Sequence, residues 1–173
     1  CAFIGNGAGL GNLNGTQILS ATIPSDALNN SWRTIGNAGT STRTHFLGTT
    51  DNQPLEFRVN NQRVFRIGTN ANGAPNFLSG SPANSIGTNV EGATIAGGGI
   101  GLYPNRITAN YATIGGGTFH TVEGEWSTVA GGRDNIVQGN HATVAGGRGN
   151  LIRPLVEYGT IAGGGFNGIN TNG

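Results

Sequence analysis

The second half of the chain repeats one short phrase, in which a Thr and a branched apolar residue precede a pair of glycines. The phrase reads ATIAGGG at 93–99, ATIGGG at 112–117, STVAGG at 127–132, ATVAGG at 142–147 and GTIAGGG at 159–165. A second branched apolar residue lies between successive phrases. The first apolar series is Ile95, Ile114, Val129, Val144 and Ile161, and the second is Ile86, Ile107, Val122, Val137, Ile152 and Ile169.

The spacing of these two series sets the length of the repeat. Where no loop is lengthened, the steps alternate between seven and eight residues, which gives a unit of 15 residues with two short strands. The longer steps are insertions at the connections, the largest of them around GIGLYP at 99–104. Such a unit is too short to hold a helix and two strands, and it predicts one turn of a narrow parallel β-solenoid or β-roll. A single turn cannot bury its own apolar residues, so stacking must make the core.

Two other features keep the same register. Two residues before each position of the second series stand Asn84, Asn105, His120, Asn135, Asn150 and Asn167. We expect these polar side chains to hydrogen-bond to their equivalents one turn away. The glycine pairs follow each Thr strand, and we expect them to supply the positive φ angles of a tight corner.

Side chains alternate along a strand, so each Thr strand has a core side and an outer side. In YATIG at 111–115, Ala112 and Ile114 are assigned to the core, and Tyr111, Thr113 and Gly115 to the outside. The outer columns are Tyr111, Trp126, His141 and Tyr158; Thr94, Thr113, Thr128, Thr143 and Thr160; and Ala96, Gly115, Ala130, Ala145 and Ala162. The prediction is a flat face of small residues beside an aromatic edge.

Such a face suits several uses besides that of an exposed surface without a partner. It can pack against sister chains in a trimer, which is the leading hypothesis because a thin core gains from the added burial. The aromatic column can instead hold a ligand such as a sugar. The Thr column can bind ice, although its neighbouring column is Ala or Gly rather than a second row of Thr. The candidate interface or ligand residues are Tyr111, Trp126, His141, Tyr158, Thr113, Thr128, Thr143 and Thr160.

The first 80 residues lack the repeat. Residues 1–15 are rich in Gly and Asn and predict an irregular segment, residues 16–80 a small antiparallel β module, and residues 81–173 a roll of about five repeats. In LEFRVNNQRVFRI at 55–67, apolar and charged residues alternate around a turn signal at Asn60–Asn61, which predicts a hairpin. Two further short strands are expected in 31–40 and 45–49. The expected fold class is all-β: this module followed by a parallel β-solenoid, assembled as a homotrimer.

Composition and motif content argue against several function classes. Glycine accounts for 33 of 173 residues without a G-X-Y period, which excludes collagen. Charged residues make up 10% and the net charge is +1, which argues against electrostatic binding to nucleic acid or membrane surfaces. No apolar run is long enough to span a membrane. His45, His120 and His141 form no metal-ligand pattern, and Glu123 and Glu125 share a corner rather than a cleft. We expect no catalytic residue, no metal and no cofactor.

The segment TIGNAGTSTRTHFLGTTDNQPLEFRVNNQRVFRI at 34–67 resembles a module that precedes glycine-rich GGG repeats in large bacterial surface proteins and in some phage tail-fibre proteins. The repeats resemble the β-roll head of trimeric autotransporter adhesins, the YadA-like head family. Together the resemblance covers about residues 16–169. It implies a cell-surface or virion location, a homotrimer or higher filament, and a host-surface glycan or protein as the partner.

The sequence therefore predicts a non-enzymatic extracellular fibre or adhesin module that serves structural display and surface attachment. One alternative keeps the fold and changes the setting, to a phage tail-fibre receptor-binding segment or a self-assembling extracellular filament subunit. A polysaccharide-acting β-solenoid enzyme is more distant, because it would need carboxylates gathered in one groove.

Overall fold

The computed structural model describes residues 36–69 and 73–170, and within these ranges the chain forms only strands and turns. The predicted irregular segment at 1–15 lies outside the described residues. In the described part of the chain, no helix is present that could carry the backbone across a bilayer.

The first regular structure is an antiparallel unit of β1 (Leu55–Val59), β2 (Gln62–Gly68) and β3 (Asn76–Ser79). β1 and β2 form the predicted hairpin, with Asn60 at φ 48° and Asn61 at φ 56° in its turn. Two residues at positive φ match the twist of the strands they join, and asparagine tolerates this region better than most residues. β3 pairs antiparallel with β2 on one edge and parallel with the first Thr strand on the other.

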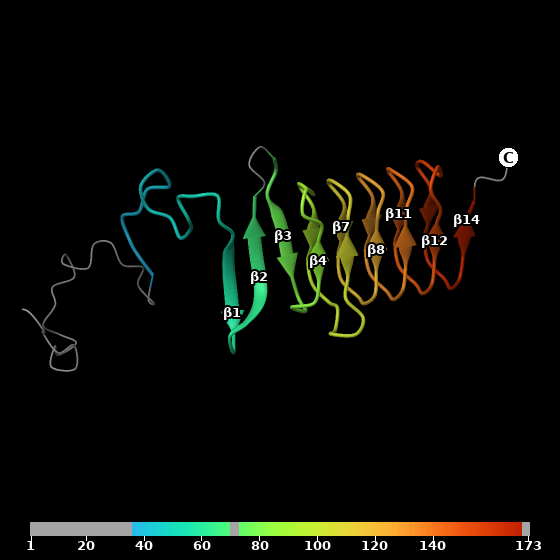
Figure 1. Ribbon diagram of the computed structural model, residues 1–173, viewed down its shortest axis with the longest axis horizontal. Helices are drawn as coiled ribbons and strands as arrows, with labels where there is room; N and C mark the ends of the chain where they lie inside the picture. Colours follow the sequence, from blue (N-terminus) through green and yellow to red (C-terminus); the bar gives the residue numbers. More distant parts are fainter. Residues whose placement is uncertain (1–35, 70–72, 171–173) are drawn as a thin grey trace, which may run out of the picture. The chain divides into compact units, whose positions relative to one another are not determined.

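Two-residue strands then alternate between two parallel sheets. They are β4 (Ser85–Ile86), β5 (Thr94–Ile95), β6 (Arg106–Ile107), β7 (Thr113–Ile114), β8 (Thr121–Val122), β9 (Thr128–Val129), β10 (Ile136–Val137), β11 (Thr143–Val144), β12 (Leu151–Ile152), β13 (Thr160–Ile161) and β14 (Gly168–Ile169). One sheet has the order β1-β2-β3-β5-β7-β9-β11-β13 and the other β4-β6-β8-β10-β12-β14. The strands follow one another along one axis (Figure 1), so this part of the chain is a β-solenoid.

The strand register confirms the repeat read from the sequence. Thr113 pairs with Thr128, and Thr128 with Thr143, so equivalent residues 15 positions apart are neighbours in the sheet. Where the connection is longer, equivalent residues still pair although they are more than 15 positions apart, as Thr143 and Thr160 do. The insertions therefore lengthen corners and leave the strands in register.

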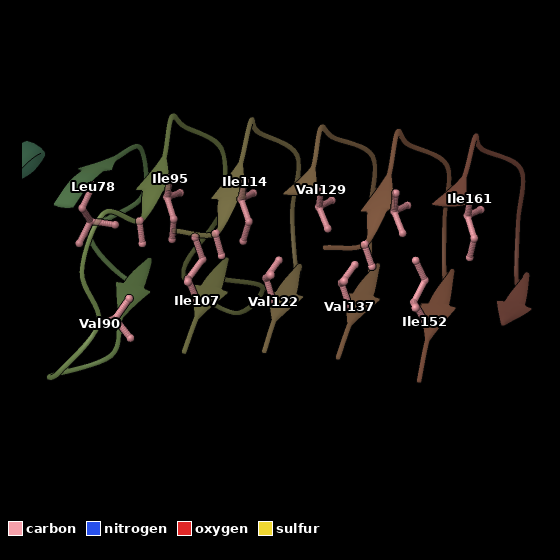
Figure 2. Close-up of a cluster of buried hydrophobic side chains, with 14 residues drawn as sticks. Leu78, Val90, Ile95, Ile107, Ile114, Val122, Val129, Val137, Ile152 and Ile161 are labelled. Carbon is pink, nitrogen blue, oxygen red and sulfur yellow. The ribbon is translucent and has the colours of Figure 1, made fainter. Parts of the chain in front are cut away.

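The core consists of two facing rows of branched side chains, one from each sheet. Side chains from the two rows point toward one another (Figure 2), and Ile114, Val129 and Val144 have no solvent exposure. At about 1.5–3 kcal/mol for each fully buried branched side chain, these two rows provide the main apolar stabilisation of the solenoid. Ala112 is fully buried beside it, as predicted, and Ile86 and Ile169 are only partly buried against it.

A continuous ladder of polar side chains runs beside the core, buried except at Asn167, and we call it the Asn ladder. Its members are Asn84, Asn105, His120, Asn135, Asn150 and Asn167. In Asn135 the side-chain oxygen accepts the backbone N–H of Asn150 at 3.0 Å. Its amide donates to the carbonyls of Gly131 at 3.1 Å and Gly147 at 3.2 Å. The predicted bonding between turns is confirmed, and the glycine corners supply the second set of acceptors.

His120 takes one place in the Asn ladder and must reproduce the bonds of an asparagine. Its Nδ1 accepts the backbone N–H of Asn135 at 3.1 Å, so the ring hydrogen belongs on Nε2, which donates to the carbonyl of Gly132 at 3.0 Å. The ring is fully buried. Burial lowers the pKa of His120 below its usual range, because the charged form would lose its hydration.

The two glycines of each pair have different tasks. Gly132 has φ 93°, and a Cβ there would meet the backbone carbonyl of Gly147 on the next turn. Gly131 does not have a positive φ, and a Cβ there would meet nothing within 4 Å. The sequence predicts a positive φ at both glycines of a pair. In the structure of this corner, only the second glycine needs one.

Two strands expected upstream are not formed in the described residues. Residues 36–49 contain turns and bends but no strand, and residues 31–35 lie outside the described part of the chain. Gly36 and Gly39 have φ of 87° and 69°, which interrupts an extended run. Downstream, the carbonyl of Ser41 accepts the N–H of Thr44 and of His45, so local turn bonds replace pairing in a sheet.

Candidate binding and interface surfaces

The aromatic column forms a stack of parallel rings, here named the aromatic ladder, which consists of Tyr111, Trp126, His141 and Tyr158. Ring centroids are 6.0 Å apart between Tyr111 and Trp126, 4.9 Å between Trp126 and His141, and 5.0 Å between His141 and Tyr158. The planes differ by 7°, 6° and 12° respectively. The four residues therefore belong together, as the register predicted.

The aromatic ladder lies at a corner rather than on the flat face. Its members have φ between 53° and 60°, in the left-handed region that non-glycine residues seldom adopt. At this corner the N–H of Trp126 donates to the carbonyl of Asn110 at 3.1 Å, and that of His141 to Glu125 at 2.8 Å. These bonds between turns hold the backbone in that conformation. Continuing the strand alternation back from Thr113 places Tyr111 on the outer face. That placement is wrong because the chain turns at Tyr111, where φ is 56°.

The stacking limits what the aromatic ladder can bind. Tyr111 covers one face of the Trp126 ring and His141 covers the other, so the edge of the indole meets solvent. A sugar ring stacks on an aromatic face, and only the outer faces of the two end rings are free of a ladder neighbour. Trp126 is 50% exposed and Tyr158 is 71% exposed in the single chain.

Acidic and amide side chains border the aromatic ladder. The hydroxyl of Tyr111 donates to Glu91 at 2.8 Å, and this bond to a carboxylate raises the pKa of Tyr111. Glu125 accepts from the side-chain amide of Asn110 at 3.4 Å. Glu123 accepts from the amide of Gln138 at 2.9 Å. The two glutamates considered as a catalytic pair are thus each bonded to a separate amide, although both line one shallow, open pocket together with Thr108.

The Thr column occupies a second surface, the outward side of the eight-stranded sheet, which we call the outer face. Thr113, Thr128 and Thr143 are half-buried, and Thr160 is exposed. They are in register with one another across β7, β9, β11 and β13. The eight candidate residues therefore fall into two groups of four, one on a corner and one on the outer face.

The outer face continues into the antiparallel unit, where its character changes. Thr94 pairs with Phe77, Phe77 with Ile67, and Ile67 with Leu55, so these residues share one side of the sheet. Phe57 and Phe65 lie beside them, with ring centroids 5.9 Å apart, and Phe65 is 6.3 Å from Phe77. We name this set, Leu55, Phe57, Phe65, Ile67 and Phe77, the apolar cluster.

The opposite side of the same three strands is charged. Leu78 faces the solenoid core and pairs with Arg66, which in turn pairs with Glu56. Glu56 forms an ion pair with Arg58 at 2.7 Å. Arg63 donates to the carbonyls of Pro82 at 2.8 Å and Asn84 at 3.1 Å, and so covers the start of the solenoid. In the solenoid the core side of this sheet is apolar and the outer side is polar. In β1 and β2 the side that continues the core side carries Glu56 and Arg66, and the outer side is apolar.

Sequence reasoning missed the apolar cluster. The alternation of Leu55 and Phe57 with Glu56 and Arg58 was visible, and it separated the two sides of the hairpin. It could not tell which side continues as the outer face, because that depends on the register between β3 and β5.

The remaining titratable residues form no metal centre in the described part of the chain, where no group of three His, Cys, Asp or Glu side chains could hold an ion. His45 bonds within a local turn, His120 belongs to the Asn ladder and His141 to the aromatic ladder.

Comparison with known proteins gives no relative. No protein-family model matches the chain. No curated protein and no solved structure matches it either. The class defined by the structure is a β-solenoid preceded by an antiparallel three-stranded unit.

Proposed function

We propose that this chain is a non-enzymatic module of an extracellular fibre or adhesin, which acts as a homotrimer in structural display and surface attachment. The observation that carries the proposal is the unbroken rung-to-rung bonding of the solenoid. Every buried side-chain nitrogen and oxygen in the described residues has a hydrogen-bond partner, and the Asn ladder joins each turn to the next. Such a stack is a stiff spacer whose length follows from the number of its turns.

The surfaces of this chain support a structural or binding role better than a catalytic one. The aromatic ladder and the outer face repeat equivalent side chains from turn to turn, whereas catalysis requires convergent groups around a reacting atom. Glu123 and Glu125 line one shallow, open pocket, but their carboxylates bond to different amides. The sequence resemblance to adhesin heads and tail-fibre modules favours an extracellular setting.

Adhesion of coated beads to cultured epithelial cells tests the attachment role. Beads that carry the full chain should bind, and beads that carry the chain with Val144→Asp should not, since Val144 is fully buried in the core. Equal adhesion of the two bead types would contradict attachment by the folded module. Light scattering on the same full chain tests the homotrimer separately, and a monomer at micromolar concentration would contradict it.

A further inference from the structure

We infer that the outer face of the eight-stranded sheet is where copies of this chain bind one another side by side, with the apolar cluster as the central contact. This inference rests on the homo-oligomer proposed above and assigns its interface. The aromatic ladder, which the sequence had suggested as part of that interface, then lies at the edge of the contact.

The first argument is the exchange of polarity at β3. In a hairpin that packs on its own core, the apolar side faces inward. Here Phe57 and Phe77 are 42% and 39% exposed on the outer face, while Glu56 and Arg66 occupy the core side. Three phenylalanines on one side of an exposed sheet, with Phe65 in ring contact with both Phe57 and Phe77, mark a protein-binding surface.

The second argument is the absence of charge along the outer face. The residues in register with Leu55 are Ile67, Phe77 and the Thr column, and none of them is ionisable. The neighbouring column holds Ala96, Gly115 and Ala130, which carry no side chain larger than a methyl group. A flat, uncharged sheet face can approach a neighbouring copy closely without burying an unpaired charge.

The third argument is the charge at the two edges of this face, which identifies the partner as a second copy. At the corner of the aromatic ladder lie Glu91, Glu125 and Glu157, with Arg153 as the one basic residue of that corner in the described chain. At the opposite corner Arg133 and Arg148 are neighbours in a bridged column, beside Asp134. One edge is therefore mainly acidic and the other mainly basic.

These edges cannot pair within one chain, because a strand separates them. In the described residues the ion pairs all involve Glu56 in the hairpin, and none includes an edge residue. A copy turned about an axis parallel to the solenoid brings its acidic edge to the basic edge of its neighbour. A head-to-tail contact of this kind closes into a ring when the rotation permits, as in a trimer.

The first experiment removes the apolar cluster. In the full chain, the double variant Phe57→Glu, Phe77→Glu should remain folded by circular dichroism and sediment as a monomer where the unmodified chain is an oligomer. The matched control is Val64→Glu, which places the same charge at an apolar residue that is 38% exposed and, by alternation along β2 from Phe65, lies on the opposite side of the sheet. The control should assemble as the unmodified chain does.

The second experiment tests the edges with a charge exchange on one turn of the solenoid. Glu125→Arg and Arg133→Glu should each raise the concentration needed for assembly by roughly tenfold or more, because like charges then meet. The double variant that carries both changes should recover assembly. If each single change acted only through its own chain, by loss of the Asn110 bond or of the Arg133 contact with Tyr103, the double variant would show no recovery.

The outcomes separate the two proposals. A monomeric unmodified chain would overturn the homo-oligomer and this interface together, including the case in which residues 1–35 of the same chain cover the apolar cluster. An oligomer that survives Phe57→Glu, Phe77→Glu in folded form would overturn only the interface. Loss of assembly in that variant without recovery in the charge exchange would overturn the head-to-tail arrangement.

Discussion

His120 and Asn135 are joined by a hydrogen bond from the backbone N–H of Asn135 to the imidazole Nδ1, 3.1 Å long and fully buried. An asparagine oxygen makes the equivalent bond on the neighbouring turns, and it cannot be protonated near neutral pH. At His120, protonation would place a second N–H against that donor. The Asn ladder thus contains one position that responds to pH.

Acid should destabilise the solenoid through His120. Its folded pKa is lowered, so its neutral form contributes stability fully above the unfolded pKa of about 6.5. That contribution is lost as the pH falls from about 6.5 toward the folded pKa. Thermal melts between pH 7.5 and 5 should show a falling midpoint, and His120→Asn should flatten this slope. An unchanged slope in His120→Asn would contradict the assignment.

The two glycines of a corner should respond in opposite ways to alanine. Gly132→Ala places a Cβ against the carbonyl of Gly147 at φ 93°, so we expect a loss of about 2–4 kcal/mol in unfolding free energy from strain and overpacking. Gly131→Ala has open space and no positive φ, so it should change stability by less than about 1 kcal/mol or increase it. Urea titrations of the two variants check this, and equal losses would show that the corner does not depend on φ.

Val144→Asp should unfold the solenoid locally or completely. Val144 is fully buried between the two sheets, and an unpaired carboxylate there should cost about 3–5 kcal/mol. Leu155→Asp is the matched control, since Leu155 is 85% exposed. Differential scanning calorimetry should separate the two variants by a large shift in melting temperature. If Val144→Asp melts with the control, the inward register of β11 is wrong.

Trp126→Ala should lower the stability of the fold, because the variant loses the ring contacts of the indole. The variant loses stacking on Tyr111 and His141, which at about 0.5–1.5 kcal/mol per aromatic pair amounts to about 1–3 kcal/mol. Leu155→Ala supplies the control, because Leu155 also has a positive φ, of 69°, but belongs to no ring stack. In chemical denaturation, Trp126→Ala should have a clearly lower unfolding midpoint than the control. Identical midpoints would mean that the aromatic ladder contributes nothing to stability.

Trp126 should be accessible to a quencher dissolved in the solvent, because half of its surface is exposed. In a chain with Trp32 replaced by Phe, iodide should quench Trp126 fluorescence, because the indole is 50% exposed at an edge of the outer face. Complete protection from iodide in the assembled protein would place the aromatic ladder inside the interface, contrary to the arrangement inferred above.

The solenoid was predictable because its determinants are periodic. Apolar residues that recur every 15 positions fixed the strand pairs, and Asn60–Asn61 fixed the hairpin. The position of Tyr111 was harder, because a positive φ at a non-glycine residue leaves no mark in the residue letters. The apolar cluster was hidden for another reason, since its side of the sheet is decided by a pairing between distant segments, Phe77 with Thr94.

β3 is the strand at which antiparallel pairing gives way to parallel pairing, and this gives the fold a starting point in time. A hairpin with a two-residue turn closes within about 1–10 μs, because its contacts are local. β3 then completes that unit and presents an edge to which β5 can add in parallel. Each later turn finds the previous one already in place, so we expect folding to advance along the stack from β3. A break at one turn should then halt every turn beyond it.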